Sequence, residues 1–171
     1  MRSDDINRSK ETALEGVQKN GLLLAELGKK FQSDHAIVLA AVSNHPLAIK
    51  YASKQLQVDP EILLASISGY GFAMRFAPKK LRESREFVLK AVRANGHAFL
   101  YIADELKNDR EIVLTAVKSA GDALAHCPIE FCSDPEIVIA AISETIFAVQ
   151  FVPEAGDLPG LAEMREEFKK L

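Results

Sequence analysis

Hydrophobic and polar positions recur along this chain with a period of 25 residues. The stretches 59–74 (DPEILLASISGYGFAM), 109–124 (DREIVLTAVKSAGDAL) and 134–149 (DPEIVIAAISETIFAV) align without a gap. In units two to six, apolar residues stand at positions 4, 5, 6 and 9, with a small residue at position 8, whereas the first unit is atypical and has Thr12 at position 4. This spacing predicts a helix with a wide apolar stripe. Six units cover residues 9–158, and they start at Ser9, Asp34, Asp59, Ser84, Asp109 and Asp134.

Start and stop signals bound two helices in each unit. The Asp or Ser at position 1 is a good N-cap, and the Glu that follows at position 3 in five units suits the positive end of a helix dipole. Proline at position 20 in three units ends a second helix of about two turns. An apolar residue at position 23 is expected to pin the connector to the core. Glycine at position 13 predicts the C-cap of the first helix, at Gly21, Gly71, Gly96 and Gly121.

No segment alternates apolar and polar residues with a period of two, so the sequence predicts no strands. One helical pair cannot bury its own apolar face, whereas stacked pairs form a continuous core. We therefore expect an all-α protein, an α-solenoid of six helix-turn-helix repeats with a polar segment 1–8 before it and a capping helix 159–171 after it. The six expected repeats are 9–33, 34–58, 59–83, 84–108, 109–133 and 134–158.

The C-terminal segment admits two interpretations. Leu161, Met164, Phe168 and Leu171 form one apolar stripe at helical spacing, which is typical of a cap on the last repeat. The same segment, EMREEFKKL, resembles a C-terminal signal for bacterial type IV secretion. The capping pattern also favours a complete small protein over one domain of a larger one.

The repeat resembles a family of helical repeats known as domain of unknown function 4116. The segments SREFVLKAVRANGHAFLYIADELKND and NDREIVLTAVKSAGDAL match the family pattern best, and the first repeat matches it loosely. The resemblance implies tandem helices and no known activity, and no site residues come with it. Such repeats are similar to those of large bacterial proteins, including those of intracellular bacteria that secrete effectors. A weaker likeness is to the variant leucine-rich repeat, which alternates α and 3₁₀ helices; the connector after Pro78 or Pro128 is a candidate 3₁₀ turn.

Composition narrows the classes of function. The net charge is −3 over 171 residues, which argues against a dedicated nucleic-acid binder. No apolar run approaches the roughly 20 residues that span a bilayer, and the polar N-terminus is not a secretory signal. Two cysteines do not make a disulfide framework. We expect a cytoplasmic protein, or one translocated into a host cell without a signal peptide.

Candidate chemistry is sparse. His126 precedes Cys127, but neighbouring side chains on a helix point about 100° apart, so the histidine is poorly placed to activate the thiol. Cys127 occupies position 19, an apolar position in the other repeats, which favours packing. The remaining histidines, His35, His45 and His97, form no column of metal ligands. The sequence predicts no catalytic residue, no metal and no cofactor.

The polar side of the first helix is the candidate binding surface. Positions 7, 10 and 11 vary while the core positions hold, and variable columns of solenoids often bind partners. Small residues there would leave a shallow groove flanked by cations. The candidates are Ser43, Asn44, Ser68, Lys90, Arg93, Lys118 and Ser119.

Two further patterns have a functional and a structural interpretation. Basic residues are concentrated within 78–93. They form either a docking patch for an acidic partner or membrane phosphate, or a solvated face without a partner. The candidate basic patch consists of Lys79, Lys80, Arg82 and Arg85. Position 18 is mostly aromatic, which favours packing between repeats over a surface that stacks bases; its residues are Tyr51, Phe76, Tyr101, His126 and Phe151.

These patterns favour a non-enzymatic protein-interaction scaffold, as a bacterial secreted effector or an adaptor. The alternatives are an enzyme with an unrecognised groove site, and a binder of anionic lipid or RNA through the basic patch. The expected partner is a protein whose identity the sequence does not give. Nucleic acid and peripheral membrane contact are weaker expectations.

Overall fold

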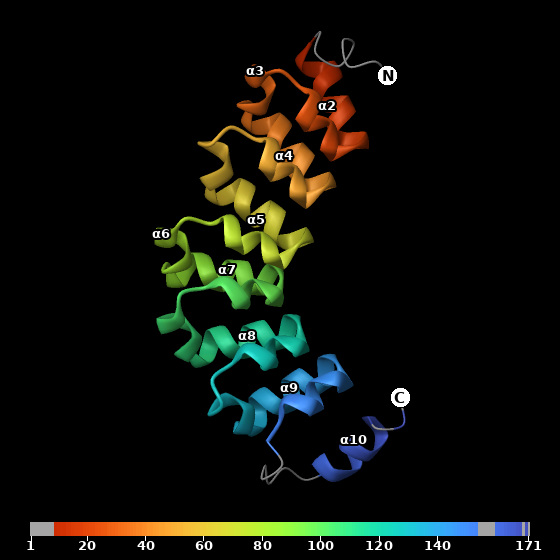
Figure 1. Ribbon diagram of the computed structural model, residues 1–171, viewed down its shortest axis with the longest axis vertical. Helices are drawn as coiled ribbons and strands as arrows, with labels where there is room; N and C mark the ends of the chain where they lie inside the picture. The colour runs from red at the N-terminus through yellow and green to blue at the C-terminus, as the bar shows by residue number, and fades with distance from the viewer. Residues whose placement is uncertain (1–8, 154–159, 169, 171) are drawn as a thin grey trace. The chain divides into compact units, whose positions relative to one another are not determined.

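The computed structural model describes residues 9–153, 160–168 and 170. Throughout this described part the chain is helical and contains no strand, with α-helices and 3₁₀ helices following each other in every repeat (Figure 1). Contacts divide the chain into two compact units, the N-terminal unit (Met1–Leu81) and the C-terminal unit (Arg82–Leu171). The predicted all-α repeat architecture is confirmed.

The N-terminal unit holds the first three repeats. In each one a ten-residue α-helix is followed by a six-residue 3₁₀ helix and a short connecting turn. Its elements are α2 (Lys10–Lys19), η1 (Gly21–Glu26), α3 (Lys29–Gln32), α4 (His35–Asn44), η2 (Pro46–Tyr51), η3 (Leu56–Val58), α5 (Pro60–Gly69), η4 (Gly71–Phe76) and α6 (Lys79–Arg82), within which the division falls.

The C-terminal unit repeats the same order and adds a final helix. Its elements are α7 (Arg85–Ala94), η5 (Gly96–Tyr101), η6 (Asp104–Asn108), α8 (Arg110–Ser119), η7 (Gly121–His126), η8 (Phe131–Ser133), α9 (Pro135–Glu144), η9 (Ile146–Phe151) and α10 (Leu161–Phe168).

The predicted N-caps are confirmed in all six repeats. Each Asp or Ser at position 1 has an extended backbone, and its side-chain oxygen accepts one or two N–H groups from the first turn. In α4, for example, Asp34 Oδ1 accepts the N–H of Ala36 at 3.1 Å and of Ile37 at 3.2 Å. The cap satisfies donors that the helix itself leaves unpaired, so the start of every repeat is set locally.

The second helix of each repeat is a 3₁₀ helix, a type that the sequence did not specify. A 3₁₀ helix has three residues per turn, and positions 13, 16 and 19 lie inward at this spacing, as Gly96, Phe99 and Ile102 do. The helix ends before position 19 in every repeat, whether position 20 is Pro78 or Ala103. Proline therefore does not set this boundary. After Pro78 the connector is the α-helical turn α6, and after Pro128 it contains the 3₁₀ turn η8.

The prediction that the position-13 glycines are helix C-caps is wrong. Among the described residues only Gly160 has a positive φ, whereas Gly96 simply begins η5. A Cβ atom at Gly96 would lie 2.4 Å from the carbonyl oxygen of Ala116 in the next repeat. At Gly21 and Gly121 the added atom would also meet a backbone oxygen, at 2.2 and 2.3 Å. Glycine is needed here because two repeats approach each other closely.

The core is a column of small and aliphatic side chains. In the ten-residue α-helices positions 5 and 8 are buried in every repeat, and position 9 is buried in all but the last, where Ile142 is half-buried. The 3₁₀ helix adds position 16 in every repeat and position 15 in all but the first, where Leu23 is half-buried. In α8 positions 5, 8 and 9 are Val113, Ala116 and Val117, joined at position 4 by Ile112, all without exposure to solvent. Position 6, predicted as core, is only half-buried in most repeats and is exposed at Ile139.

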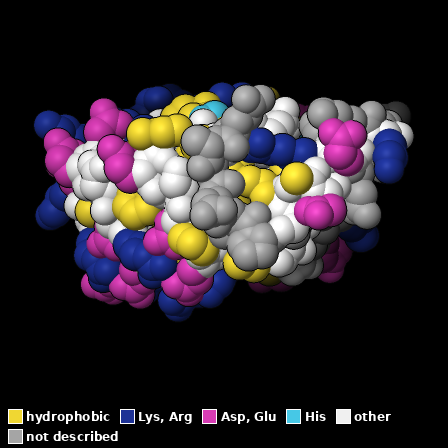
Figure 2. All heavy atoms as spheres, turned by 90° about the horizontal axis from the view of Figure 1, so that it is seen from below, with side chains coloured by type: hydrophobic (Ala, Val, Ile, Leu, Met, Phe, Trp, Pro, Cys, Tyr) yellow, Lys and Arg dark blue, Asp and Glu magenta, His cyan; other side chains and the backbone are white. Residues whose placement is uncertain are grey.

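The final helix α10 packs on η9 of the last repeat. Leu161 is buried, and Arg165 Nη2 donates to the carbonyl oxygens of Val152 at 2.7 Å and Pro153 at 2.9 Å. Figure 2 views this end and shows hydrophobic side chains with acidic and basic ones toward both edges. The side chains of Met164, Phe168 and Leu171 from the expected stripe, and segment 1–8, lie outside the described residues. The expected secretion signal ends on Lys169 and Leu171, which also lie outside them.

Candidate functional site

Ion pairs join successive repeats along one edge of the C-terminal unit. The side chain at position 2 reaches the N-cap Asp and the position-3 Glu of the next repeat, 24 and 26 residues on. Arg110 Nε donates to Asp134 Oδ2 at 3.0 Å, while its Nη2 donates to Asp134 Oδ1 at 3.2 Å and to Glu136 Oε2 at 2.7 Å. Arg85 donates to Asp109 through Nε and Nη2 and to Glu111 through Nη2, in the same arrangement. Each guanidinium thus bridges two carboxylates of the next repeat.

At the equivalent edge of the N-terminal unit, position 2 holds Lys10 and His35 in place of arginine. Lys10 Nζ donates to Asp34 Oδ2 at 2.6 Å. His35 Nε2 lies 3.6 Å from Asp59 Oδ1 and 3.5 Å from Glu61 Oε2. The pKa of Asp34 is lowered, first by the hydrogen bond from Lys10. The pKa of Asp109 and of Asp134 is lowered for the same reason, by Arg85 and Arg110 respectively.

A second set of contacts engages two of the predicted binding residues. Asn44 Oδ1 accepts the N–H of Gly21 in the preceding repeat at 2.7 Å, and Asn44 Nδ2 donates to the carbonyl oxygen of Gln18 at 2.9 Å. Ser119 Oγ accepts the N–H of Gly96 at 2.9 Å. In both cases the side chain at position 11 accepts the backbone N–H of the position-13 glycine in the preceding repeat, where the two repeats approach closely.

The contact between the second and third repeats replaces both partners. Position 13 of the second repeat is Pro46, which has no N–H to offer, and position 11 of the third is Gly69, which has no side chain to receive one. A Cβ atom at Gly69 would lie 2.5 Å from Cγ of Pro46. Ser66 Oγ instead donates to the carbonyl oxygen of Pro46 at 2.8 Å. The two exceptions to the repeat thus compensate each other.

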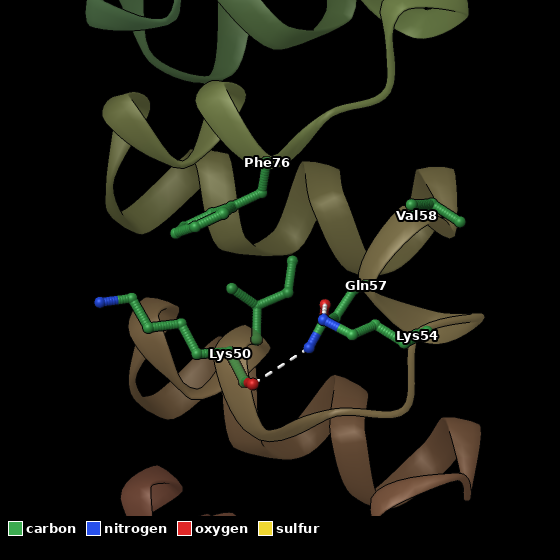
Figure 3. A pocket seen from close by; sticks show the side chains of 6 residues that line it. Lys50, Lys54, Gln57, Val58 and Phe76 are labelled. Carbon is green, nitrogen blue, oxygen red and sulfur yellow. Dashed lines mark hydrogen bonds between the residues drawn. The ribbon is translucent and has the colours of Figure 1, made fainter.

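The N-terminal unit has a groove on the side of its 3₁₀ helices. It encloses about 280 Å³ between η2, η3 and η4. Figure 3 shows Phe76 on one side of it and Lys54 and Val58 on the other. Gln57 Nε2 donates to the carbonyl oxygens of Lys50 at 3.0 Å and Ala52 at 2.9 Å, which holds the connector in place. Its lining is Ile49, Lys50, Lys54, Gln57, Val58 and Phe76.

The C-terminal unit has a larger groove of about 550 Å³, lined by three successive repeats. His97 Nε2 lies 3.1 Å from a carboxylate oxygen of Asp122, and His97 Nδ1 lies 3.1 Å from Asn95 Oδ1. Glu144 Oε2 accepts the N–H of Gly121 at 2.6 Å. The lining also includes Ser119, Ala120, Thr145, Phe147, Gln150 and Phe151.

The remaining predicted binding residues lie on the exposed ends of the α-helices. Ser43 and Ser68 are exposed on α4 and α5 of the N-terminal unit, and Arg93 and Lys118 are exposed in the last turns of α7 and α8. Lys90 is paired with Glu86 one turn earlier, at 2.7 Å. Of the predicted surface, Ser119 lines the groove of the C-terminal unit.

The predicted basic patch has two kinds of residue. Lys79 and Lys80 are exposed on α6, at the end of the N-terminal unit. Arg82 is half-buried, and Arg85 belongs to the ion pairs with Asp109 and Glu111. Those pairs reduce the charge that the patch offers to an anion.

The cysteines lack the features of a nucleophile. Burial raises the pKa of the Cys127 thiol to about 12 and also raises the pKa of Cys132. The Cys127 thiol donates to the carbonyl oxygen of Ala123 at 3.4 Å. A thiol with so high a pKa is protonated at neutral pH, and the thiolate is the reactive form.

Within the described residues no group of His, Cys, Asp and Glu side chains is arranged to hold a metal ion. No helix in the same part of the chain is long and apolar enough to cross a membrane. The position-18 side chains are half-buried, or exposed as at Tyr51 and His126.

Sequence reasoning missed both grooves and the ion pairs between repeats. The pairs had a visible signal, because a basic residue at position 2 is followed 24 and 26 residues later by Asp and Glu. The grooves had only a partial signal, because Phe76 and Phe151 stand at the mostly aromatic position 18. Asp122 and Phe147 gave none, because the residue type at position 14 changes from repeat to repeat.

The fold and the contacts between repeats define an all-α tandem-repeat protein. The chain belongs to the family described as Domain of unknown function (DUF4116), whose model matches residues 9–57, 59–107, 84–130 and 109–155. These matches begin at the first residue of the first, third, fourth and fifth repeats. No curated protein and no solved structure matches the chain.

Proposed function

We propose that this chain is a non-enzymatic scaffold that binds a protein partner in the groove of the C-terminal unit. The observation that carries the proposal is the lining of this groove by equivalent positions of successive repeats. Position 14 supplies His97, Asp122 and Phe147 at intervals of 25 residues. An extended segment lying across the repeats would meet a polar, an acidic and an aromatic side chain in turn.

The side chains around the groove suit a preformed binding surface. Ser119 and Glu144 each hold a glycine N–H of the preceding repeat, so their positions are fixed before a partner arrives. Phe147 is 52% exposed, and an exposed aromatic ring is the usual anchor of an interface. Arg93 and Lys118 lie in the last turns of α7 and α8 and are exposed to solvent, where they favour an approaching acidic segment.

The chemistry of the groove favours binding over catalysis. A histidine that acts as a general base needs a ring nitrogen directed at the proton it removes. Both nitrogens of His97 already lie at hydrogen-bonding distance from Asn95 and Asp122. Cys127 is not among the residues that line the groove, and its raised pKa removes the thiol as a nucleophile at neutral pH.

The test is a capture experiment followed by an affinity measurement. A partner retained from lysate by the wild-type chain would be purified and titrated calorimetrically against Phe147→Ser and Arg93→Glu/Lys118→Glu. We expect each variant to weaken binding tenfold or more, because an anchor or the complementary charge is lost. Ser43→Asp/Ser68→Asp, on the N-terminal unit, is the matched control and should bind like the wild type.

Circular dichroism would first establish equal helicity for all variants. A partner that binds the Phe147 and Arg93/Lys118 variants with wild-type affinity would contradict the proposed site. Turnover of a substrate by the wild type, lost in His97→Gln, would contradict the non-enzymatic assignment.

A further inference from the structure

The connector halves of the repeats carry opposite charge in the two units. We define the connector half as positions 14–25, which contain the 3₁₀ helix and the turn after it. In the N-terminal unit these segments hold seven exposed cations and one carboxylate: Lys29, Lys30, Lys50, Lys54, Arg75, Lys79, Lys80 and Glu26. In the described part of the C-terminal unit, repeats four to six hold four exposed carboxylates and one lysine: Asp104, Glu105, Asp122, Glu130 and Lys107.

The basic side contains the groove of the N-terminal unit. Ile49 and Phe76 give it apolar walls, and Lys50 and Lys54 stand exposed at its edge. The guanidinium of Arg75 lies 4.9 Å from the centre of the Phe76 ring, which adds a further cation. A volume of about 280 Å³ is at the small end of ligand pockets and suits a side chain rather than a cofactor. Its chemistry therefore fits an apolar side chain next to a carboxylate.

The acidic side presents such a pair. Ile129 is 64% exposed, more than any other large hydrophobic residue of the described chain, and Glu130 beside it is also exposed. Their turn is held by the N–H of Phe131, which donates to the carbonyl oxygen of Pro128 at 3.0 Å, and by the N–H of Cys132, which donates to that of Ile129 at 3.1 Å. The turn thus holds the Ile129 side chain in contact with water, and exposure of this apolar surface costs free energy.

We infer that a second copy of this chain docks here, with Ile129 of one copy in the N-terminal groove of the other. Glu130 then meets Lys50 and Lys54. The acidic connector halves of one copy lie against the basic connector halves of the other. Burial of Ile129 supplies the apolar part of the contact, and the opposite charges orient the encounter. This contact uses a different groove from the one assigned to the protein partner, so each can fail without the other.

Self-association would be measured by sedimentation velocity over a range of protein concentrations. We expect the wild type to associate in low salt and to dissociate as salt rises to about 0.5 M, where charges more than a few ångströms apart are screened. Ile129→Ser should weaken association at least tenfold. Ile139→Ser is the matched control: this residue is also exposed, at 57%, but it lies on α9, outside the connector side.

Charge-reversal variants distinguish this contact from non-specific association. Lys50→Glu/Lys54→Glu and Glu130→Lys should each be monomeric, because each change brings like charges together in the contact. An equimolar mixture of the two variants should associate again. The groove that Lys50→Glu/Lys54→Glu makes acidic then meets the lysine that the other variant carries at position 130, and the unchanged Glu130 meets the unchanged lysines. Circular dichroism would confirm that both variants are folded.

Three outcomes would overturn the inference. They are a wild type that stays monomeric at every concentration, an Ile139→Ser variant as impaired as Ile129→Ser, and a mixture that does not associate. A monomeric wild type that binds the synthetic peptide HCPIEFCS (residues 126–133) would give the groove an acidic, apolar peptide partner in place of a second copy.

Discussion

The two units build the same frame from different polar side chains. In the C-terminal unit Arg85 and Arg110 each hold two carboxylates of the next repeat. In the N-terminal unit, Lys10 makes one short contact, and the contacts of His35 are longer than 3.4 Å. A planar guanidinium matches a carboxylate at two points, whereas an ammonium or imidazole does not. The core positions hold in both units, so the polar edge is where the repeat is free to vary.

The same contrast holds for the close contact between repeats. In the C-terminal unit a glycine N–H meets Ser119 or Glu144, and in the N-terminal unit Asn44 plays this part once. The other N-terminal contact uses Pro46 and Gly69. One packing problem thus has two solutions, a hydrogen bond or the removal of both the donor and the side chain.

Removal of a large core side chain should have the largest effect. Phe99→Ala empties a fully buried position of the C-terminal unit and should lower its free energy of unfolding by about 3–5 kcal/mol. Met74→Ala, at the same position of the N-terminal unit, should cost about 2–5 kcal/mol there. Hydrogen exchange measured by mass spectrometry reports on each unit separately. Phe99→Leu, which restores the residue type of Leu24 and Leu124, should cost clearly less.

The glycine contacts should be the next most sensitive. Gly96→Ala meets the backbone oxygen of Ala116 and should destabilise by about 1–3 kcal/mol, because backbone cannot move aside as a side chain can. Gly69→Ala meets the ring of Pro46, so its cost should shrink when Pro46 is also changed to Gly. Denaturant unfolding of the two single variants and the double variant gives this coupling. Equal costs for Gly69→Ala in both backgrounds would contradict the compensating pair.

Acid should weaken the polar edge in a defined direction. The folded-state pKa values of Asp34, Asp109 and Asp134 lie below the ordinary value, so their stabilisation is present above about pH 4 and is lost as pH falls through the folded pKa. Arg110→Gln removes the first cause of the lowered pKa of Asp134. The titration of the Asp134 carboxyl group, followed by NMR, should then move to higher pH, whereas the titration of Asp34 should not change.

Conversion of one unit to the chemistry of the other should have the smallest effect. His35→Arg gives the N-terminal unit the fork that Arg110 makes, and it should stabilise by about 0–1 kcal/mol, as exposed pairs do. Guanidinium chloride would screen this gain, so urea unfolding is the suitable measurement. The reverse change, Arg110→His, should destabilise the C-terminal unit by a similar amount.

The candidate site was only partly predictable from the sequence. Ser119 does line a groove, and Arg93 and Lys118 are exposed as expected. Asn44 stands in a variable column, which predicts a free surface, yet both ends of its amide are bound to the preceding repeat. A column varies where a surface is free, and it also varies where a contact can be made in more than one way. The sequence pattern does not distinguish these two cases.

The repeat length, the start of each α-helix and most residues of the core follow from the amino-acid sequence alone. These features depend on groups close together in the chain, such as Asp34 and the N–H groups two and three residues later. Contacts between repeats set the 3₁₀ form of the second helix, the role of the glycines, the ion pairs and the grooves. Each of these depends on a backbone or side chain about one repeat away, such as Ala116 against Gly96, whose approach appears only when repeats are stacked.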